Sequence, residues 1–151
     1  MRHTLAAITI ACLTACTGTP ERKVGVVDDT GTRLTLALKA DPADKYGSAF
    51  AAYQALSQRW LDAYSLAGST PRIALPPVIS NMQGIRREMA ALSLPPCLSR
   101  AKPFRLAAMD RQLNGMTAFL AMEPADSGNL ERASALVESA TAITKACNPE
   151  I

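Results

Sequence analysis

PPVISNMQGIRREMAALSLPP, residues 76–96, has the pattern of an amphipathic helix enclosed by two pairs of prolines. Its large apolar residues recur at steps of three and four, which place them on one helical face. They are Val78, Met82, Ile85, Met89 and Leu92. Proline is tolerated in the first turn of a helix but not in its interior. The sequence therefore predicts a helix that begins near Pro76 and ends at Leu94-Pro95-Pro96.

Three further segments show the same period. The first begins at Asp41-Pro42, an expected N-cap and first-turn proline, and stops before Gly68 and Pro71. Its periodic positions are Tyr46, Phe50, Tyr53, Trp60 and Tyr64. The next segment has Leu106, Met109, Leu113, Met116 and Leu120, and Pro103 predicts that it begins near residue 102 or is kinked there. The last, after a loop at 123–129, has Leu130, Ala133, Val137, Ala140, Thr144 and Cys147. We expect an all-α protein, an up-down four-helix bundle.

A β signal precedes the helices. Leu34, Leu36 and Leu38 alternate with smaller or polar residues, and valines precede a turn-rich stretch at 28–31. We expect residues 23–39 to form a short β-hairpin or an extended segment. An isolated hairpin is only marginally stable in water, so it would have to pack on another element.

The N-terminus carries an export signal. Arg2 is followed by an apolar run of about 13 residues, shorter than the roughly 20 that a helix needs to span a bilayer. The run closes on Leu13-Thr14-Ala15-Cys16, which resembles the lipobox of bacterial lipoproteins at every position. An ordinary cleaved signal would not need a cysteine at the junction. The resemblance covers residues 1–16 and implies cleavage before Cys16, with a diacylglycerol on its sulfur.

This resemblance predicts how the chain is divided into segments. Residues 1–15 are expected to be a cleaved signal peptide, residues 16–40 a lipid-anchored tether with the possible hairpin, and residues 41–151 the helical bundle domain. Thr17 follows the lipidated cysteine, where an aspartate would retain the protein in the inner membrane. In a Gram-negative host, the expected location is the outer membrane, with the domain facing the periplasm.

Cysteine and histidine usage limits the chemistry. With Cys12 removed and Cys16 lipidated, Cys97 and Cys147 remain as an even pair in an exported protein, which predicts one disulfide. An antiparallel pairing of the last two helices would bring them to the same end of the molecule. The single histidine, His3, leaves with the signal. Without a histidine, the mature protein is not expected to contain a histidine-dependent catalytic triad, a histidine-ligated zinc site or a histidine-ligated haem.

Two short motifs match enzyme signatures without their context. Asp29-Thr30-Gly31 occurs once, whereas aspartic proteases need two such loops on a largely β domain. Ser99 and Lys102 have the Ser-x-x-Lys spacing of penicillin-recognising enzymes, but the chain lacks the Ser-Asp-Asn and Lys-Thr-Gly elements. We interpret the first as a turn and the second as a helix cap beside a surface lysine. No metal site or cofactor is predicted, and we expect a protein that is not an enzyme.

Composition excludes a nucleic-acid partner. Loss of Arg2 leaves 15 Lys and Arg against 13 Asp and Glu, which is far from strongly basic. Two candidate binding surfaces remain. The first is an aromatic face formed by Tyr53, Trp60 and Tyr64, although core packing is the competing interpretation. The second is a basic region that could face lipid headgroups or an acidic partner, against the alternative of a solvated helix end. It comprises Arg86, Arg87, Arg100, Lys102, Arg105 and Arg111.

The expected function is a non-enzymatic, lipid-anchored module of the cell envelope that binds a protein partner. That partner could be another envelope protein, or a secreted toxin that the module neutralises as an immunity protein. The alternative is a helical-bundle carrier of a small apolar ligand or lipid, with the aromatic helix as one wall of its cavity. A pocket of several hundred Å3 would favour the carrier over the interaction module.

Overall fold

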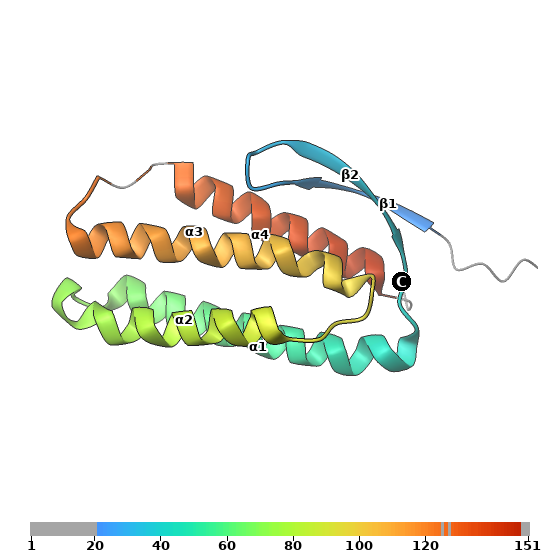
Figure 1. Cartoon of the computed structure of the whole chain (residues 1–151), viewed down its shortest axis with the longest axis horizontal. Coiled ribbons are helices and arrows are strands. Elements are labelled where there is room, and N and C mark those ends of the chain that lie inside the picture. Colours follow the sequence, from blue (N-terminus) through green and yellow to red (C-terminus); the bar gives the residue numbers. More distant parts are fainter. Residues whose placement is uncertain (1–20, 125, 127, 149–151) are drawn as a thin grey trace, which may run out of the picture.

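The computed structural model describes residues 21–124, 126 and 128–148, which form a hairpin followed by four helices (Figure 1). The strands are β1 (Glu21–Val27) and β2 (Arg33–Lys39). The helices are α1 (Ala43–Ser69), α2 (Leu75–Ala91), α3 (Lys102–Ala121) and α4 (Gly128–Cys147). Short 3-10 turns, η1 (Arg72–Ala74) and η2 (Leu98–Ala101), precede α2 and α3. Successive helices run up and down, so the predicted all-α four-helix bundle with an N-terminal β-hairpin is confirmed.

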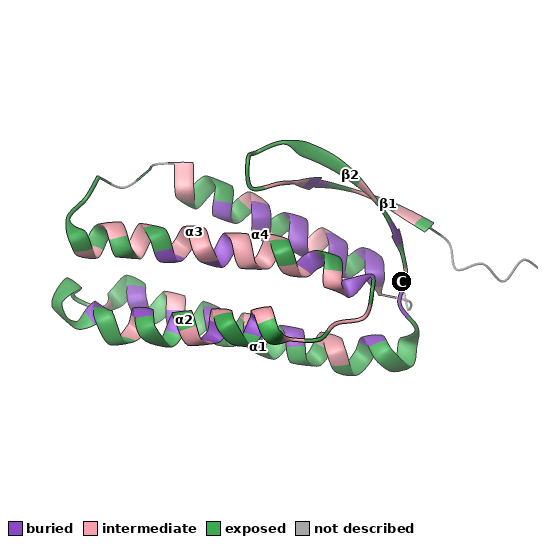
Figure 2. Cartoon of the chain, in the orientation of Figure 1, coloured by how far each residue is buried: buried purple, intermediate pink, exposed green. Residues whose placement is uncertain are grey.

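The core follows the predicted apolar stripes. Figure 2 shows buried positions recurring along the inward sides of the helices, while the outward sides are exposed. Met82 and Met89 on α2 and Met109 on α3 are fully buried, as are Ala140 and Ile143 on α4. Leu130 is an exception among the predicted stripe residues, because it lies in the first turn of α4 and is 61% exposed. In the described part of the chain, no helix has the length and hydropathy needed to cross a bilayer.

A tight turn joins the two strands of the hairpin. One carboxylate oxygen of Asp28 accepts hydrogen bonds from the backbone N–H of Thr30 and of Thr32 and from the Thr30 hydroxyl. These bonds favour the charged form, with the Thr30 hydroxyl contributing most, and they lower the pKa of Asp28 below its ordinary value. Gly31 has φ of 87°, a left-handed conformation that glycine adopts without a steric penalty. The turn fixes the register, in which Val27 pairs with Arg33 and Glu21 with Lys39.

The hairpin is part of the folded domain. Ser139 on α4 accepts a hydrogen bond from Val27 N–H at 2.7 Å, and its oxygen also lies 3.1 Å from Val27 O. Val26 and Leu38, one from each strand, are buried in the same core as the helices. β1 and β2 therefore pack on the bundle through their apolar face, as a hairpin that is only marginally stable alone requires.

Asp41 does not cap α1. Pro42 occupies the N-cap position and makes no side-chain capping bond, whereas the buried carboxylate of Asp41 accepts the N–H groups of Cys97 and Leu98, each at 2.8 Å. The predicted N-cap is wrong because the Asp41 carboxylate is buried beside the N–H groups of Cys97 and Leu98. A buried carboxylate needs hydrogen-bond donors, and these two groups supply them in place of the first turn of α1. Asp41 thus joins the start of α1 to the approach to α3.

The predicted disulfide is present. Cys97 and Cys147 are bonded, with their Cα atoms 5.6 Å apart, and the bond links the start of η2 to the end of α4. Both residues are buried, so the bond lies inside the domain. The predicted signal peptide at residues 1–15 and the predicted lipidation site at Cys16 lie outside the described residues.

Candidate interaction surface at the apolar end

One end of the bundle exposes large apolar side chains. There α1 and α3 finish and α2 and α4 begin (Figure 1). Seven large apolar residues are exposed in the described part of the chain, and five of them belong to this end. They are Leu66, Ile73, Phe119, Met122 and Leu130, and we call the surface they form the apolar end. Single exposed leucines need no explanation, whereas several exposed large apolar residues at one end of a protein are a candidate binding surface.

Met122 combines a left-handed backbone conformation with an exposed side chain. Met122 ends α3 with φ of 60°, the left-handed conformation that usually falls to glycine. The N–H of Glu123 donates to Ala118 O at 2.9 Å, which closes the helix end. The Met122 side chain is 73% exposed. Methionine does not favour this backbone conformation, and its exposed side chain does not favour solubility. Strained positions of this kind cluster at functional sites.

An open pocket of about 430 Å3 lies beside these residues. It is bounded by the last turns of α1, by α3 and by the first turn of α4. Its apolar lining is Tyr64, Ala67, Leu75, Met116, Phe119 and Leu130, and its polar lining includes Gln112, Arg111, Asp126 and Asn129. Leu75 and Ala67 are buried, whereas Phe119 and Leu130 stand at the exposed rim. The size and the predominantly apolar lining suit a small apolar ligand.

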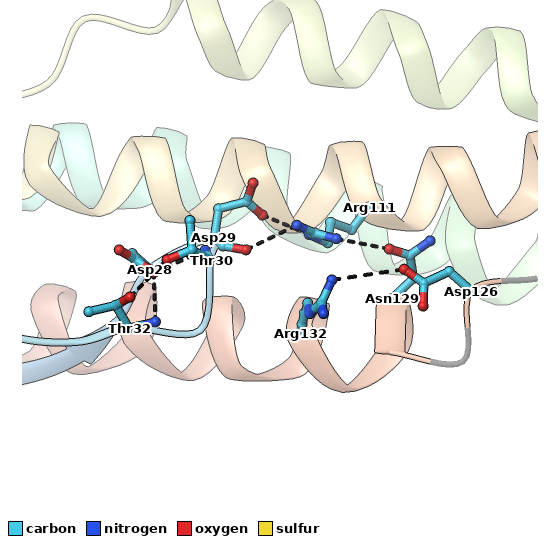
Figure 3. A network of polar contacts seen from close by, with 8 residues as sticks. All are labelled: Asp28, Asp29, Thr30, Thr32, Arg111, Asp126, Asn129 and Arg132. Atoms are coloured by element: carbon cyan, nitrogen blue, oxygen red, sulfur yellow. Dashed lines mark hydrogen bonds and ion pairs between the residues drawn. The ribbon is translucent and has the colours of Figure 1, made fainter.

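The polar side of the pocket is held by Arg111 (Figure 3). Its Nε–H donates to Asp29 Oδ1 at 2.7 Å, its Nη2–H to Asp29 O at 3.0 Å and its Nη1–H to Asn129 Oδ1 at 3.0 Å. The hydrogen bond to Asp29 is the main cause that raises the pKa of Arg111 above its ordinary value. Arg111 thereby ties the hairpin turn to α3 and to the first turn of α4.

The charges around the pocket are balanced. Arg111 faces Asp29, and Arg132 lies 3.9 Å from Asp126 (Figure 3). Gln112, which also lines the pocket, accepts the indole N–H of Trp60 at 2.7 Å. Because each arginine has a carboxylate partner, this site does not present a net charge to a ligand. It favours recognition by apolar contact.

The predicted aromatic face is wrong for two of its three residues. Tyr53 and Trp60 are each only 2% exposed, and the competing interpretation as core is the correct one for them. The polar atoms of both find partners inside the protein, because Arg105 donates to the Tyr53 hydroxyl and Trp60 donates to Gln112. Tyr64 is half-buried and forms part of the pocket wall. Only Tyr64 therefore lies where a ligand or a partner could reach it.

The predicted basic region does not form one surface. Arg86 makes a two-pronged ion pair with Asp110, at 2.6 and 2.7 Å, and the hydrogen bond to that carboxylate raises the pKa of Arg86. Lys102 donates to Ala90 O and Leu92 O at the end of α2. The other members are dispersed: Arg87 is exposed on α2, Arg100 donates to Ala37 O in β2, Arg105 lies over the Tyr53 ring and Arg111 belongs to the pocket.

A buried carboxylate and two sulfurs meet at the opposite end of the bundle. The ligand atoms of Asp41, Cys97 and Cys147 all lie within 4.8 Å of one another, a grouping that could suggest a metal site. The two sulfurs are bonded to each other, however, and both carboxylate oxygens of Asp41 accept backbone N–H groups. In this state the three residues act as a structural junction.

Periodicity could not have revealed the apolar end, because Leu66, Phe119 and Met122 lie off the predicted stripes. Their position beside Gly68, Pro71 and Pro124 was the available signal, since these residues end helices and leave neighbouring apolar side chains without a facing helix. No family model matches the chain, and neither a curated protein nor a solved structure matches it.

Proposed function

We propose that this protein is a lipid-anchored module of the bacterial cell envelope that binds a protein partner through its apolar end. The observation that carries the proposal is the concentration, among the described residues, of five of the seven exposed large apolar side chains at one end of the bundle, where Phe119 and Leu130 also line an open pocket. The partner is an envelope protein or a secreted toxin that covers the exposed side chains of the apolar end with a complementary apolar surface. Lipobox residues 13–16 support the anchor and Thr17 supports an outer-membrane location facing the periplasm.

The position of the anchor supports this use of the apolar end. Cys16 precedes Glu21 by five residues, so the chain between them reaches about 17 Å at most. Glu21 begins β1 and pairs with Lys39, near the start of α1, at the end of the bundle opposite Met122 (Figure 1). A helix the length of α3 is about 30 Å long. An anchored molecule can therefore hold its apolar end away from the membrane, where a partner can approach it.

Crosslinking in cells tests the proposal. We expect a photoreactive residue at Met122 to capture a discrete protein, and the same protein carrying the double variant Leu66→Glu/Ile73→Ser to lose that product. Leu61, 50% exposed on α1 and outside the apolar end, is the matched control, so Leu61→Ser should retain it. No crosslinked product from Met122, or equal products from the double variant and the wild type, would contradict partner binding by this surface.

The pocket supports a second candidate, a carrier of a small apolar ligand. Gly115 separates the two functions, because it lines the pocket and a Cβ built on it meets no atom within 4 Å. Gly115→Leu should fill the pocket while leaving the exposed residues in place. If the carrier is correct, native mass spectrometry of purified protein should show an extracted lipid that Gly115→Leu excludes. If the interaction module is correct, Gly115→Leu should still crosslink to the partner.

A further inference from the structure

All five lysines of the chain lie at the end of the bundle opposite the apolar end. Lys23 and Lys39 lie at the start of β1 and the end of β2, Lys45 in the first turn of α1, Lys102 at the start of α3 and Lys145 in the last turn of α4. Contacts between these elements confirm that they meet. Glu21 pairs with Lys39, Cys97 is bonded to Cys147, and the Tyr46 hydroxyl donates to Thr144 O at 2.7 Å. We call residues 21–24, 37–46, 97–105 and 144–148 the anchor-side end.

The anchor-side end is strongly basic. Its cations are Arg22, Lys23, Lys39, Lys45, Arg100, Lys102, Arg105 and Lys145, and its acids are Glu21, Asp41 and Asp44. The Asp41 carboxylate is buried and already hydrogen-bonded to backbone, so it does not face the surface. Lys23, Lys39, Lys45, Arg100 and Lys145 are exposed.

Elsewhere in the described chain the balance is reversed. Seven arginines stand against nine acids, and four of those arginines are ion-paired: Arg59 with Glu88, Arg86 with Asp110, Arg111 with Asp29 and Arg132 with Asp126. Among the described residues, none of the five lysines takes part in an ion pair. The net charge of the whole chain is small, but the charge is unevenly distributed: one end of the molecule is basic and the other end is apolar.

We propose that the anchor-side end docks on the anionic phospholipid headgroups of the membrane that holds the lipid anchor. This inference rests on the proposed anchor at Cys16, which would place the end within about 17 Å of the bilayer. Exposed lysines at that position attract anionic lipid over a distance comparable to the Debye length of about 8 Å at physiological salt. Acyl chains combined with a basic surface form a two-signal attachment to the membrane. The basic surface also orients the molecule, so that the apolar end points away from the membrane.

Lysine acetylation measures the docking directly. Full-length acylated protein is reconstituted into vesicles of phosphatidylcholine alone or with 30% phosphatidylglycerol, and acetylation of each lysine is timed by peptide mass spectrometry. We expect Lys23, Lys39, Lys45 and Lys145 to react at least about threefold more slowly on the anionic vesicles, because the surface raises the local proton concentration and contact shields the amines. High salt, 0.5 M NaCl, should remove the difference.

Arg72→Lys supplies the matched control, because Arg72 is exposed in η1 at the far end of the bundle. The amine introduced there should react equally on both kinds of vesicle. Equal rates at the four native lysines on both vesicles, or equal slowing of the Arg72→Lys amine, would overturn the docking. Protection by polyglutamate in neutral vesicles that matches the protection by phosphatidylglycerol would instead identify an acidic protein as the ligand.

The same samples separate this inference from the proposed anchor. Intact mass shows whether the N-terminus carries acyl chains before any vesicle is added. If it carries none, the anchor fails, and flotation of the unacylated protein with the anionic vesicles still tests the basic surface. If acylation is confirmed and the lysines show no dependence on lipid charge, the anchor stands and the docking fails.

Discussion

Asp41 joins two segments that are far apart in the sequence, the start of α1 and the start of η2, and its loss should destabilise the fold. Its buried carboxylate accepts the N–H groups of Cys97 and Leu98, beside the disulfide. Asp41→Ala would leave two buried donors unpaired and should lower the free energy of unfolding by about 3 kcal/mol. Asp41→Asn should cost nearly as much, because its amide group can accept one bond but presents N–H groups to the second donor.

Chemical denaturation of these variants measures that loss. Asp44→Asn is the control, since Asp44 is an exposed acid in the first turn of α1 and should cost less than about 1 kcal/mol. An Asp41→Ala protein as stable as Asp44→Asn would show that the two hydrogen bonds contribute nothing.

Tyr46 should make stability fall at high pH. Its hydroxyl donates to Thr144 O, and burial is the main cause that raises its pKa above the ordinary value of 10.0. The contribution of the neutral phenol is fully present below pH 10 and is lost as the pH rises through the raised pKa. Tyr46→Phe should cost about 1 kcal/mol at pH 8, and the difference from wild type should shrink above pH 10. A difference that stays constant from pH 8 to pH 11 would contradict this assignment.

At the scale of elements, the hairpin depends on α4. Ser139 accepts the Val27 N–H, and Val26 and Leu38 pack into the shared core. Ser139→Ala should lower the free energy of unfolding by about 1–2 kcal/mol and speed hydrogen exchange at Val27. Ser134, whose hydroxyl only donates to Leu130 O within α4, is the control, and Ser134→Ala should leave exchange at Val27 unchanged. Slow exchange at Val27 in Ser139→Ala would mean that apolar packing alone holds the strand.

The four helices and the hairpin were predictable because each depends on local spacing, and the disulfide was predictable because Cys97 and Cys147 are the two cysteines left to pair after the expected cleavage and lipidation. Met82 and Met89 follow the helical period, and two cysteines in an exported chain pair readily. The sequence could not predict which side chains form hydrogen bonds with residues far away in the chain. Asp41 was predicted to cap its own helix, yet it binds Cys97 N–H, 56 residues away. The sequence left both a surface and a core position open for Trp60 and Tyr53, because Gln112 and Arg105 from α3 decide whether their polar atoms can be buried.

The same limit applies to the arginines. Arg86, Arg100 and Arg105 are close in sequence, but a pairing with Asp110 or with Tyr53 depends on which helix face each one occupies. The basic surface that the fold does assemble draws its lysines from the hairpin and three helices, a combination that sequence proximity does not indicate.

At the scale of the whole molecule, the attachment to the membrane should have two separable parts. Under the proposals above, attachment would come from the acyl chains on Cys16 and from the basic anchor-side end. One acyl chain holds a protein only marginally, whereas two or three chains hold it firmly. Cys16→Ser should therefore abolish labelling with radioactive palmitate and convert a detergent-dependent attachment into one that 0.5 M NaCl removes.

Adding Lys39→Glu/Lys45→Glu/Lys145→Glu to Cys16→Ser should release the protein into the soluble envelope fraction without salt, because each basic residue near an anionic surface contributes about 1 kcal/mol. Arg33→Glu/Arg72→Glu/Arg87→Glu, which changes the net charge equally at exposed residues outside the anchor-side end, should leave the salt-sensitive attachment in place. Equal release by both triple variants would mean that total charge, rather than its concentration beside the tether, determines binding. A Cys16→Ser protein that still carries acyl chains would show that the lipid is attached elsewhere.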